Sequence, residues 1–247
     1  MRGSRVALSM LLCAAVPAAA SEARHAHWEY TGKAGPTHWG ELEKDFGACS
    51  AGHEQSPINL TRMKDVELPA IAFDYHPGGY RVVNNGHAVQ VDFKPGSSIT
   101  LEGTRYELKQ LHFHTPSENT IEGKSFPMEA HLVHADAKGH LAVVAVMFES
   151  GADNAWLAQL SSKVPGKPET ESALAASIAA TGLLPATRDY YGFNGSLTTP
   201  PCSEGVRWLV LKQTDRASQK QIALVHSAIG HDNSRPVQPL GARTVLQ

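Results

Sequence analysis

The run LAVVAVMF at residues 141–148 places the strongest constraint on how this chain can fold. It is apolar at every position and rich in valine, which predicts a strand covered on both of its faces. Such a strand belongs in the middle of a sheet. Further strands are predicted around residues 80–83, 88–93, 98–101, 105–113, 129–135 and 206–211. Because the 247 residues include 21 glycines and 15 prolines, we expect a fold rich in strands and loops.

Helical patterns are few, and they cover residues 154–164, 171–180 and 218–230. The last of these begins with a capping pattern formed by Ser218 and Gln221, and it ends at Gly230. Its apolar stripe predicts that His226 packs against the core.

Residues 25–50 show neither helical nor strand periodicity, so we expect an irregular segment anchored by Trp28, Tyr30 and Trp39. No linker rich in proline, glycine and serine divides the chain, which favours a single domain.

The first twenty residues have the pattern of a cleaved secretory signal. Arg2 and Arg5 precede a short apolar run, small residues follow, and cleavage is expected near Ala20. The apolar run is too short to span a bilayer. Removal of residues 1–20 takes away two arginines and no acidic residue, so the net charge changes from −2 to −4. The mature chain, 21–247, is therefore expected to be periplasmic or secreted, and a poor candidate for nucleic-acid binding.

Two of the three cysteines, Cys49 and Cys202, remain after signal cleavage. An exported protein meets an oxidising environment, which favours a disulfide between them, although two unrelated thiols stay open as the alternative.

The segment QLHFHTPSE at residues 110–118 holds two histidines one residue apart. In a strand, alternate side chains share a face, so Gln110, His112 and His114 point one way, while Leu111 and Phe113 point the other. Two imidazoles on one face can bind one metal ion, and surface histidines are the alternative.

A second strand, EAHLVH at residues 129–134, strengthens the prediction of a metal site. Glu129, His131 and Val133 share one face, whereas His134 lies on the other face and is expected to be hydrogen-bonded in the core. Metal-bound histidines usually donate their second N–H to a carboxylate or an amide, and Glu129 and Gln110 are placed to accept. Three neutral nitrogens with an open fourth position describe catalytic zinc. Neither a complete HExxH motif nor a GxSxG motif occurs.

At this point the sequence resembles the α-class carbonic anhydrases of the exported bacterial type. The resemblance runs from HWEYTG at 27–32 to NSRPVQPL at 233–240, and it is carried by several long motifs in one order: QSPINL (55–60), NNGHAVQVDF (84–93), QLHFHTPSE (110–118), EAHLVH (129–134), LAVVAVMF (141–148) and GSLTTPPCSEGVRWLVLK (195–212). It implies a mainly β (α+β) single domain with a large twisted, mostly antiparallel central sheet and a few short peripheral helices. It also implies a conical cleft with one Zn²⁺ at its base.

The resemblance implies an activity and a set of catalytic residues. The expected reaction is the reversible hydration of CO₂ to bicarbonate and a proton, by attack of zinc-bound hydroxide. His112, His114 and His131 fall on the zinc-ligand positions. Thr198 is expected to orient the hydroxide and to donate its own hydroxyl hydrogen to Glu118, because an ionised carboxylate only accepts. His87 falls on the proton-shuttle position.

Other matching positions form the surroundings of the site. Three polar positions are expected to hold relay waters, namely Tyr30, Asn85 and Gln90. Strand parity places Asn85 and His87 on one face but Gln90 on the other, so a bulge or twist must intervene. The apolar pocket for CO₂ and its rim are expected at Val133, Val143, Leu197, Thr199, Val206 and Trp208.

The sequence departs from the pattern of the vertebrate enzymes at two positions. Thr115 follows the second ligand where tryptophan is frequent, and Asn119 stands where histidine follows the glutamate. We expect altered packing around the site and unchanged chemistry. The resemblance also implies cis peptide bonds before Pro57 and Pro201.

Two other functions compete with this interpretation. One is a catalytically inactive, carbonic-anhydrase-like binding module, although such relatives typically lack at least one zinc histidine. The other is periplasmic metal storage, which histidine-rich tracts would support, but the thirteen histidines are scattered. The resemblance further implies inhibition by sulfonamides and small anions, and it leaves a homodimer open.

Overall fold

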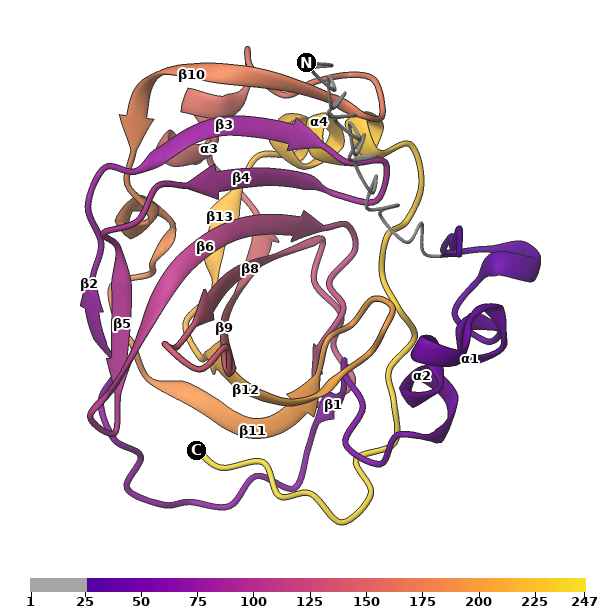
Figure 1. Cartoon of the computed structure of the whole chain (residues 1–247). Helices are drawn as coiled ribbons and strands as arrows, with labels where there is room; N and C mark the ends of the chain where they lie inside the picture. The colour runs from indigo at the N-terminus through magenta and orange to yellow at the C-terminus, as the bar shows by residue number, and fades with distance from the viewer. Residues whose placement is uncertain (1–25) are drawn as a thin grey trace, which may run out of the picture.

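The computed structural model describes residues 26–247 (Figure 1). Its strands are β1 (Asn59–Leu60), β2 (Ala72–Asp74), β3 (Gly79–Asn84), β4 (Val89–Phe93), β5 (Ser98–Leu101), β6 (Thr104–His114), β7 (Thr120–Ile121), β8 (Met128–Ala135), β9 (Leu141–Ser150), β10 (Thr170–Ile178), β11 (Tyr190–Ser196), β12 (Glu204–Leu211) and β13 (Asp215–Ala217). Its helices are α1 (Trp39–Leu42), α2 (Ala48–Ala51), α3 (Ala155–Leu160) and α4 (Gln219–Ile229), with 3₁₀ turns η1 (Gly32–Ala34), η2 (Lys44–Phe46) and η3 (Ala180–Leu183). The predicted fold class, mainly β with few short helices, is confirmed.

One large twisted sheet dominates the fold (Figure 1). Its central path runs β10-β3-β4-β6-β8-β9-β12-β11, with β5 paired to β6, β2 to β5 and β13 to β9. The pairs that β9 makes with β12 and β13 are parallel, and the other pairs of this sheet are antiparallel. The predicted strands at 80–83, 88–93, 98–101, 105–113, 129–135, 141–148 and 206–211 are all present.

Strand β9 is covered on both faces, as its sequence predicts. Alternate residues of the strand join two different hydrophobic clusters. Ala142, Val144, Val146 and Phe148 belong to the larger cluster, and the intervening residues Val143, Ala145 and Met147 belong to the smaller one. The smaller cluster lies on the face of the sheet that also carries His131, which pairs with Ala145.

The helix predicted at 171–180 is wrong, because most of this segment is strand β10 at the edge of the sheet. Leu174 and Ile178 pack against the larger cluster. Their spacing of four residues suits one face of a helix and one face of a strand equally well. The segment forms a strand because residues 170–173 pair one to one with residues of β3, at an edge of that strand that is otherwise free.

Helix α4 has the ends that its sequence predicts. Ser218 and Gln221 form a complete capping box, and Gly230 ends the helix in the left-handed conformation, with φ of 87°. The expectation that His226 packs against the core is wrong. Its side chain is half-exposed, and its Nε2 lies 2.9 Å from Asp232 Oδ1.

Residues 26–58, the described part of the chain before β1, form a series of short helical turns and contain no strand. Tyr30, Trp39 and Phe46 form a small cluster of buried residues with the Cys49–Cys202 disulfide, and Trp28 packs against it. The predicted anchors and the predicted disulfide are therefore present. The predicted signal, residues 1–20, lies outside the described residues. Between residues 26 and 247, no helix combines the length and apolar character that crossing a bilayer requires.

Candidate metal centre

Three imidazoles converge on one face of the sheet because of strand register. His112 and His114 are alternate residues of β6, and His131 of β8 pairs directly with His112. Directly opposed residues of antiparallel strands share a face, so all three rings point the same way. Their centroids lie 4.5–5.2 Å apart. One possible ligand atom from each ring lies within 4.8 Å of the other two.

Each ring has one nitrogen close to an acceptor oxygen; for His112 and His114 the contact is a hydrogen bond, whereas the His131 contact is a close approach without hydrogen-bond geometry. His112 Nδ1 lies 2.8 Å from Gln110 Oε1, His114 Nδ1 lies 2.8 Å from the backbone oxygen of Asn233, and His131 Nε2 lies 2.9 Å from Glu129 Oε1. The hydrogen bonds of His112 and His114 favour the tautomers that leave a lone pair on the opposite nitrogen, and the Glu129 carboxylate beside His131 favours the same arrangement there. His114 Nε2 is buried and has no hydrogen-bond partner among the described residues. Three free imidazole nitrogens in one place fit a Zn²⁺ ion.

Burial keeps the three rings in the neutral form that binds metals. Desolvation lowers the pKa of His112 and His131 well below the usual value, and it also lowers that of His114. His114 and His131 are buried, whereas His112 is partly exposed to solvent. At neutral pH none of the three has to lose a proton before it can bind a metal ion.

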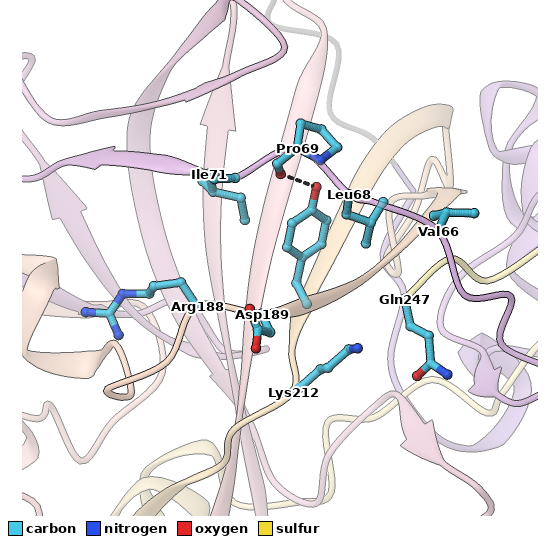
Figure 2. Close-up of a pocket in the computed structure, with 10 residues that line it drawn as sticks. Val66, Leu68, Pro69, Ile71, Arg188, Asp189, Lys212 and Gln247 are labelled. Carbon is cyan, nitrogen blue, oxygen red and sulfur yellow. Dashed lines mark hydrogen bonds between the residues drawn. The ribbon is translucent and has the colours of Figure 1, made fainter.

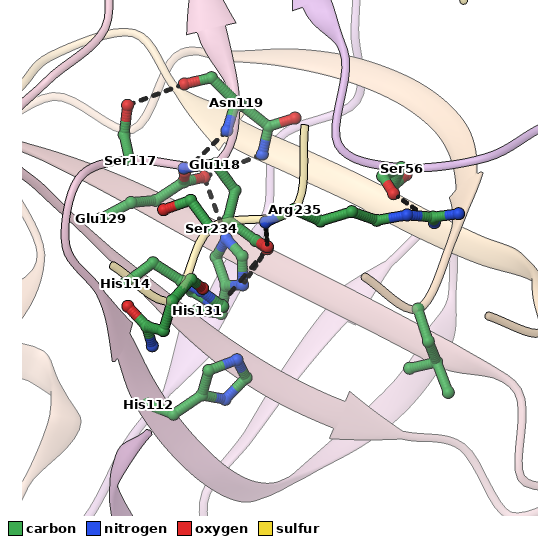
Figure 3. A network of polar contacts seen from close by, with 12 residues as sticks. Ser56, His112, His114, Ser117, Glu118, Asn119, Glu129, His131, Ser234 and Arg235 are labelled. Atoms are coloured by element: carbon green, nitrogen blue, oxygen red, sulfur yellow. Dashed lines mark hydrogen bonds and ion pairs between the residues drawn. The ribbon is translucent and has the colours of Figure 1, made fainter. Parts of the chain in front are cut away.

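Glu129 is held in place by Glu118 and Asn119, which lie beside it (Figure 3). Its Oε2 accepts hydrogen bonds from the backbone nitrogens of Glu118 at 2.8 Å and Asn119 at 2.9 Å. Its Oε1 accepts a third from Asn119 Nδ2 at 2.8 Å. Asn119, which stands where the vertebrate enzymes have histidine, thus donates an amide hydrogen bond to the Glu129 carboxylate beside His131.

Glu118 lies beside the histidines and is fully buried. Its Oε1 accepts from the backbone nitrogen of Arg235 at 2.9 Å, and its Oε2 lies 3.4 Å from His114 Nε2. Burial raises the pKa of Glu118 well above its usual value, and the nearby Thr198 hydroxyl and the hydrogen bond from the Arg235 backbone oppose that rise. The structure therefore brings Thr198 and Glu118 together, and a nearby dication would further favour the ionised carboxylate.

Arg235 is a buried cation that reasoning from the sequence did not identify. Its Nη1 donates to Gln55 Oε1 and to the Ser56 carbonyl, and its Nη2 donates to the Cys49 carbonyl. Arg235 thus joins Glu118, which its backbone nitrogen contacts, to the segment before β1, which its side chain contacts. Because Cys49 is bonded to Cys202, this connection reaches the turn that follows Thr198.

Five of the six positions expected around CO₂ gather in one hydrophobic cluster, and one of them contacts the third histidine. These five belong to the smaller hydrophobic cluster or pack against it: Val133, Val143, Leu197, Val206 and Trp208. The Trp208 ring lies 4.8 Å from the His131 ring. Thr199, the sixth position, is partly buried in the turn that contains Thr198.

The residues expected to relay protons lie on and beside the turn between β3 and β4. Asn85 Oδ1 accepts from the backbone nitrogens of His87 and Ala88, so residues 85–88 form a turn and strand parity does not apply to them. Gln90 pairs directly with His112 and therefore shares its face. Strand parity places Gln90 on the opposite side from Asn85 and His87. That argument does not apply, because the turn at residues 85–88 interrupts the strand between them.

His87 stacks on Trp28, with ring centroids 3.8 Å apart and planes inclined by 13°. The Tyr30 ring lies 6.4 Å away. Burial lowers the pKa of His87, and the positive charges of His231 and His27 add to this effect, while Glu29 opposes it.

A separate cavity of about 260 Å³ lies beside β11 (Figure 2). Arg188, Asp189 and Lys212 give it a mixed charge, and the Tyr190 hydroxyl donates to the Pro69 carbonyl. None of its lining residues belongs to the predicted site. The cis bonds expected before Pro57 and Pro201 are present, with a third before Pro116.

The fold and the three converging imidazoles define the class of the molecule: a β-sheet protein with a three-histidine metal site and an apolar wall beside it. Comparisons with known proteins identify the family. A family model for eukaryotic-type carbonic anhydrases matches residues 34–247. A carbonic anhydrase of Neisseria gonorrhoeae is 46% identical over 245 residues, which cover 98% of this chain and 95% of that protein. A carbonic anhydrase of Pectobacterium carotovorum is 42% identical over 239 residues, covering 97% and 98%.

The solved structures agree. The α-carbonic anhydrase of Thermovibrio ammonificans, in complex with the inhibitor sulfanilamide, superposes with a TM-score of 0.88 at 43% identity, covering 90% of this chain and 99% of that chain. The chain therefore belongs to the eukaryotic-type, or α-class, carbonic anhydrases.

Proposed function

We propose that this protein catalyses the zinc-dependent, reversible hydration of CO₂ to bicarbonate and a proton. The observation that carries the proposal is the convergence of His112, His114 and His131, each with one ring nitrogen within 3 Å of an acceptor oxygen and the other directed away from that acceptor. The free nitrogens Nε2 of His112, Nε2 of His114 and Nδ1 of His131 would hold the ion.

The ion supplies the nucleophile: zinc, when bound, lowers the pKa of a coordinated water to about 7, the value for which carbonic anhydrase is the standard example. The protein supplies the surroundings. Gln110 and Glu129 fix the orientation of two imidazoles, and the Asn233 carbonyl fixes the third.

Thr198 and Glu118 orient the attacking hydroxyl. Because the ionised Glu118 carboxylate can only accept, the Thr198 hydroxyl donates to it. The Thr198 oxygen then has only lone pairs to offer, so it accepts the hydrogen of the nucleophile and turns an oxygen lone pair toward the substrate. CO₂ is apolar, and the wall formed by Val143, Val206 and Trp208 provides a matching surface next to His131.

His87 takes the proton that each turnover releases, with Tyr30, Asn85 and Gln90 holding the intervening waters. Histidine suits this task because its pKa lies near neutrality. The Asn85 side chain supports the His87 turn directly, through two hydrogen bonds to its backbone.

We further propose that residues 1–20 direct export and are removed, so that the mature domain, 21–247, acts in the periplasm or outside the cell. The Cys49–Cys202 disulfide is consistent with an oxidising compartment. Since a related α-carbonic anhydrase was solved with sulfanilamide bound, we expect sulfonamides to inhibit this protein also.

The proposal is tested by CO₂ hydration measured on the zinc-loaded protein, after chelation, and after zinc is restored. Activity should disappear and return with the metal, and sulfanilamide should inhibit it. His112→Ala should lose zinc and activity together. The matched control is His140→Ala, an exposed histidine paired with Asp136, which should change neither. A zinc-loaded protein without activity would favour the inactive binding module, and binding of many ions per chain would favour metal storage.

A further inference from the structure

One buried asparagine connects the metal site to the turn that carries His87. The Asn233 backbone oxygen lies 2.8 Å from His114 Nδ1, and its Nδ2 donates to the His87 carbonyl at 2.9 Å. Asn233 Oδ1 also accepts from the backbone nitrogen of Thr115. Asn233 is fully buried, so the segment that contains it is fixed relative to both His114 and His87.

Two residues before Asn233, a second imidazole enters the surroundings of His87. A cavity of about 420 Å³ is lined by His87, His231 and His27, together with Tyr30 and Glu29. The His231 ring lies 5.6 Å from the Tyr30 ring, and the His87 ring lies 6.4 Å from the same tyrosine. At about 30 Å³ per molecule, the cavity has room for on the order of ten waters.

His87 needs an acceptor for the proton that it carries. The ring is half-buried and stacked on Trp28, which limits direct contact with a buffer molecule. His87 Nδ1 is buried and has no hydrogen-bond partner among the described residues, so no protein acceptor holds a proton on that atom. A partly exposed base on the same cavity is well placed to receive the proton.

We propose that His231 is a second proton-transfer residue, which accepts the proton from His87 across the water-filled cavity and releases it to buffer. This inference rests on the proposed CO₂ hydration. The transfer is balanced, because imidazolium at His87 becomes neutral as neutral His231 becomes imidazolium, and a buffer base then removes the proton. No other reactant is needed.

The charged and titratable groups around the cavity are compatible with this role. The carboxylates of Glu29 and Glu169 also line it, and they favour a positive charge within it, whereas His27 opposes one. The side chain of Tyr30 is buried, and the pKa of its hydroxyl is raised well above the usual value by burial and by Glu118. Tyr30 therefore stays neutral and does not compete for the proton.

The test compares His231→Gln with the unaltered zinc-loaded enzyme in weak and in concentrated buffer. In weak buffer we expect kcat to fall by about threefold to tenfold, less than the ~10²-fold typical of removing a general base outright, because solvent still accepts protons from His87. kcat/KM should not change, because it does not include the proton release that follows the chemistry. Added imidazole buffer should restore kcat.

Two controls separate a relay from a structural effect. In the background of His87→Ala, the His231→Gln change should have no further effect on kcat, because the two residues act in series. An NMR titration of the His87 ring provides a readout that does not depend on activity: its pKa should rise in His231→Gln, since the charge that lowers it is removed.

Equal losses of kcat and kcat/KM, additive effects in the double variant, or an unchanged His87 titration would each overturn the role of His231. An unaltered protein that binds zinc and hydrates no CO₂ would instead overturn the proposed function. The two failures are therefore distinguishable.

Discussion

Protonation of His134 should determine how this protein loses stability in mild acid. His134 lies on the opposite face of β8 from the metal site, and its side chain is fully buried. The Nδ1 atom contacts the Ala142 carbonyl at 3.2 Å, and Nε2 lies 2.8 Å from the Tyr75 hydroxyl. In the neutral ring, Nδ1 donates to the carbonyl and Nε2 accepts from the Tyr75 hydroxyl, so both ring nitrogens are satisfied without a charge.

The loss of stability can be calculated from the difference between the pKa of His134 in the folded and in the unfolded protein. Burial lowers the pKa of His134 from 6.5 to about 4. Between these values the unfolded chain binds a proton that the folded chain does not, so the free energy of unfolding falls as the pH falls. At 1.36 kcal/mol per unit, the full loss is about 3 kcal/mol, and about 2 kcal/mol of it should be lost by pH ~5. The contribution is fully present above pH ~6.5.

The assay is urea unfolding at pH values from about 7.5 to 5, on the unaltered protein and on His134→Gln. Glutamine can still hydrogen-bond but cannot be protonated. Any contribution from protonation of the metal ligands is common to both proteins and cancels in the difference. The unaltered protein should lose about 2 kcal/mol more than the variant across this range. Equal losses in the two proteins would refute the linkage to His134.

Three further predictions concern the surroundings of the metal site. Glu129→Gln should weaken zinc affinity by about 10- to 100-fold, measured by competition with a chelator, because it changes the acceptor on His131. Arg235→Met should lower the free energy of unfolding by about 3 kcal/mol or more in denaturant titrations, because it leaves three buried oxygens without their donor. Reduction of Cys49–Cys202, which spans 153 residues, should cost up to about 5 kcal/mol and should also lower CO₂ hydration, whereas unchanged activity would separate the disulfide from the site.

The zinc-binding face could be predicted because it depends on local geometry. In β6 and β8 the alternation of side chains is enough to place His112, His114 and His131 on one side and His134 on the other. The same rule fails for His87, because residues 85–88 leave the strand and turn around the Asn85 side chain. Parity holds only where the backbone stays extended.

Other features depend on partners that are distant in sequence. Asn233 and Arg235 lie in a segment without periodicity, and their importance comes from contacts with residues more than a hundred positions away. No local pattern could reveal these contacts. The strand β10 was misassigned for a related reason, since its identity depends on the open edge of β3 and not on its own spacing.

The central claim is that three imidazoles hold one zinc ion and leave one position to solvent. X-ray absorption at the zinc edge of the purified protein, combined with a metal count, tests it directly. We predict one zinc per chain with three nitrogen ligands at about 2.0–2.1 Å and a single oxygen from solvent. A sulfur ligand, a fourth protein ligand, or a spectrum unchanged in His112→Ala would contradict the account.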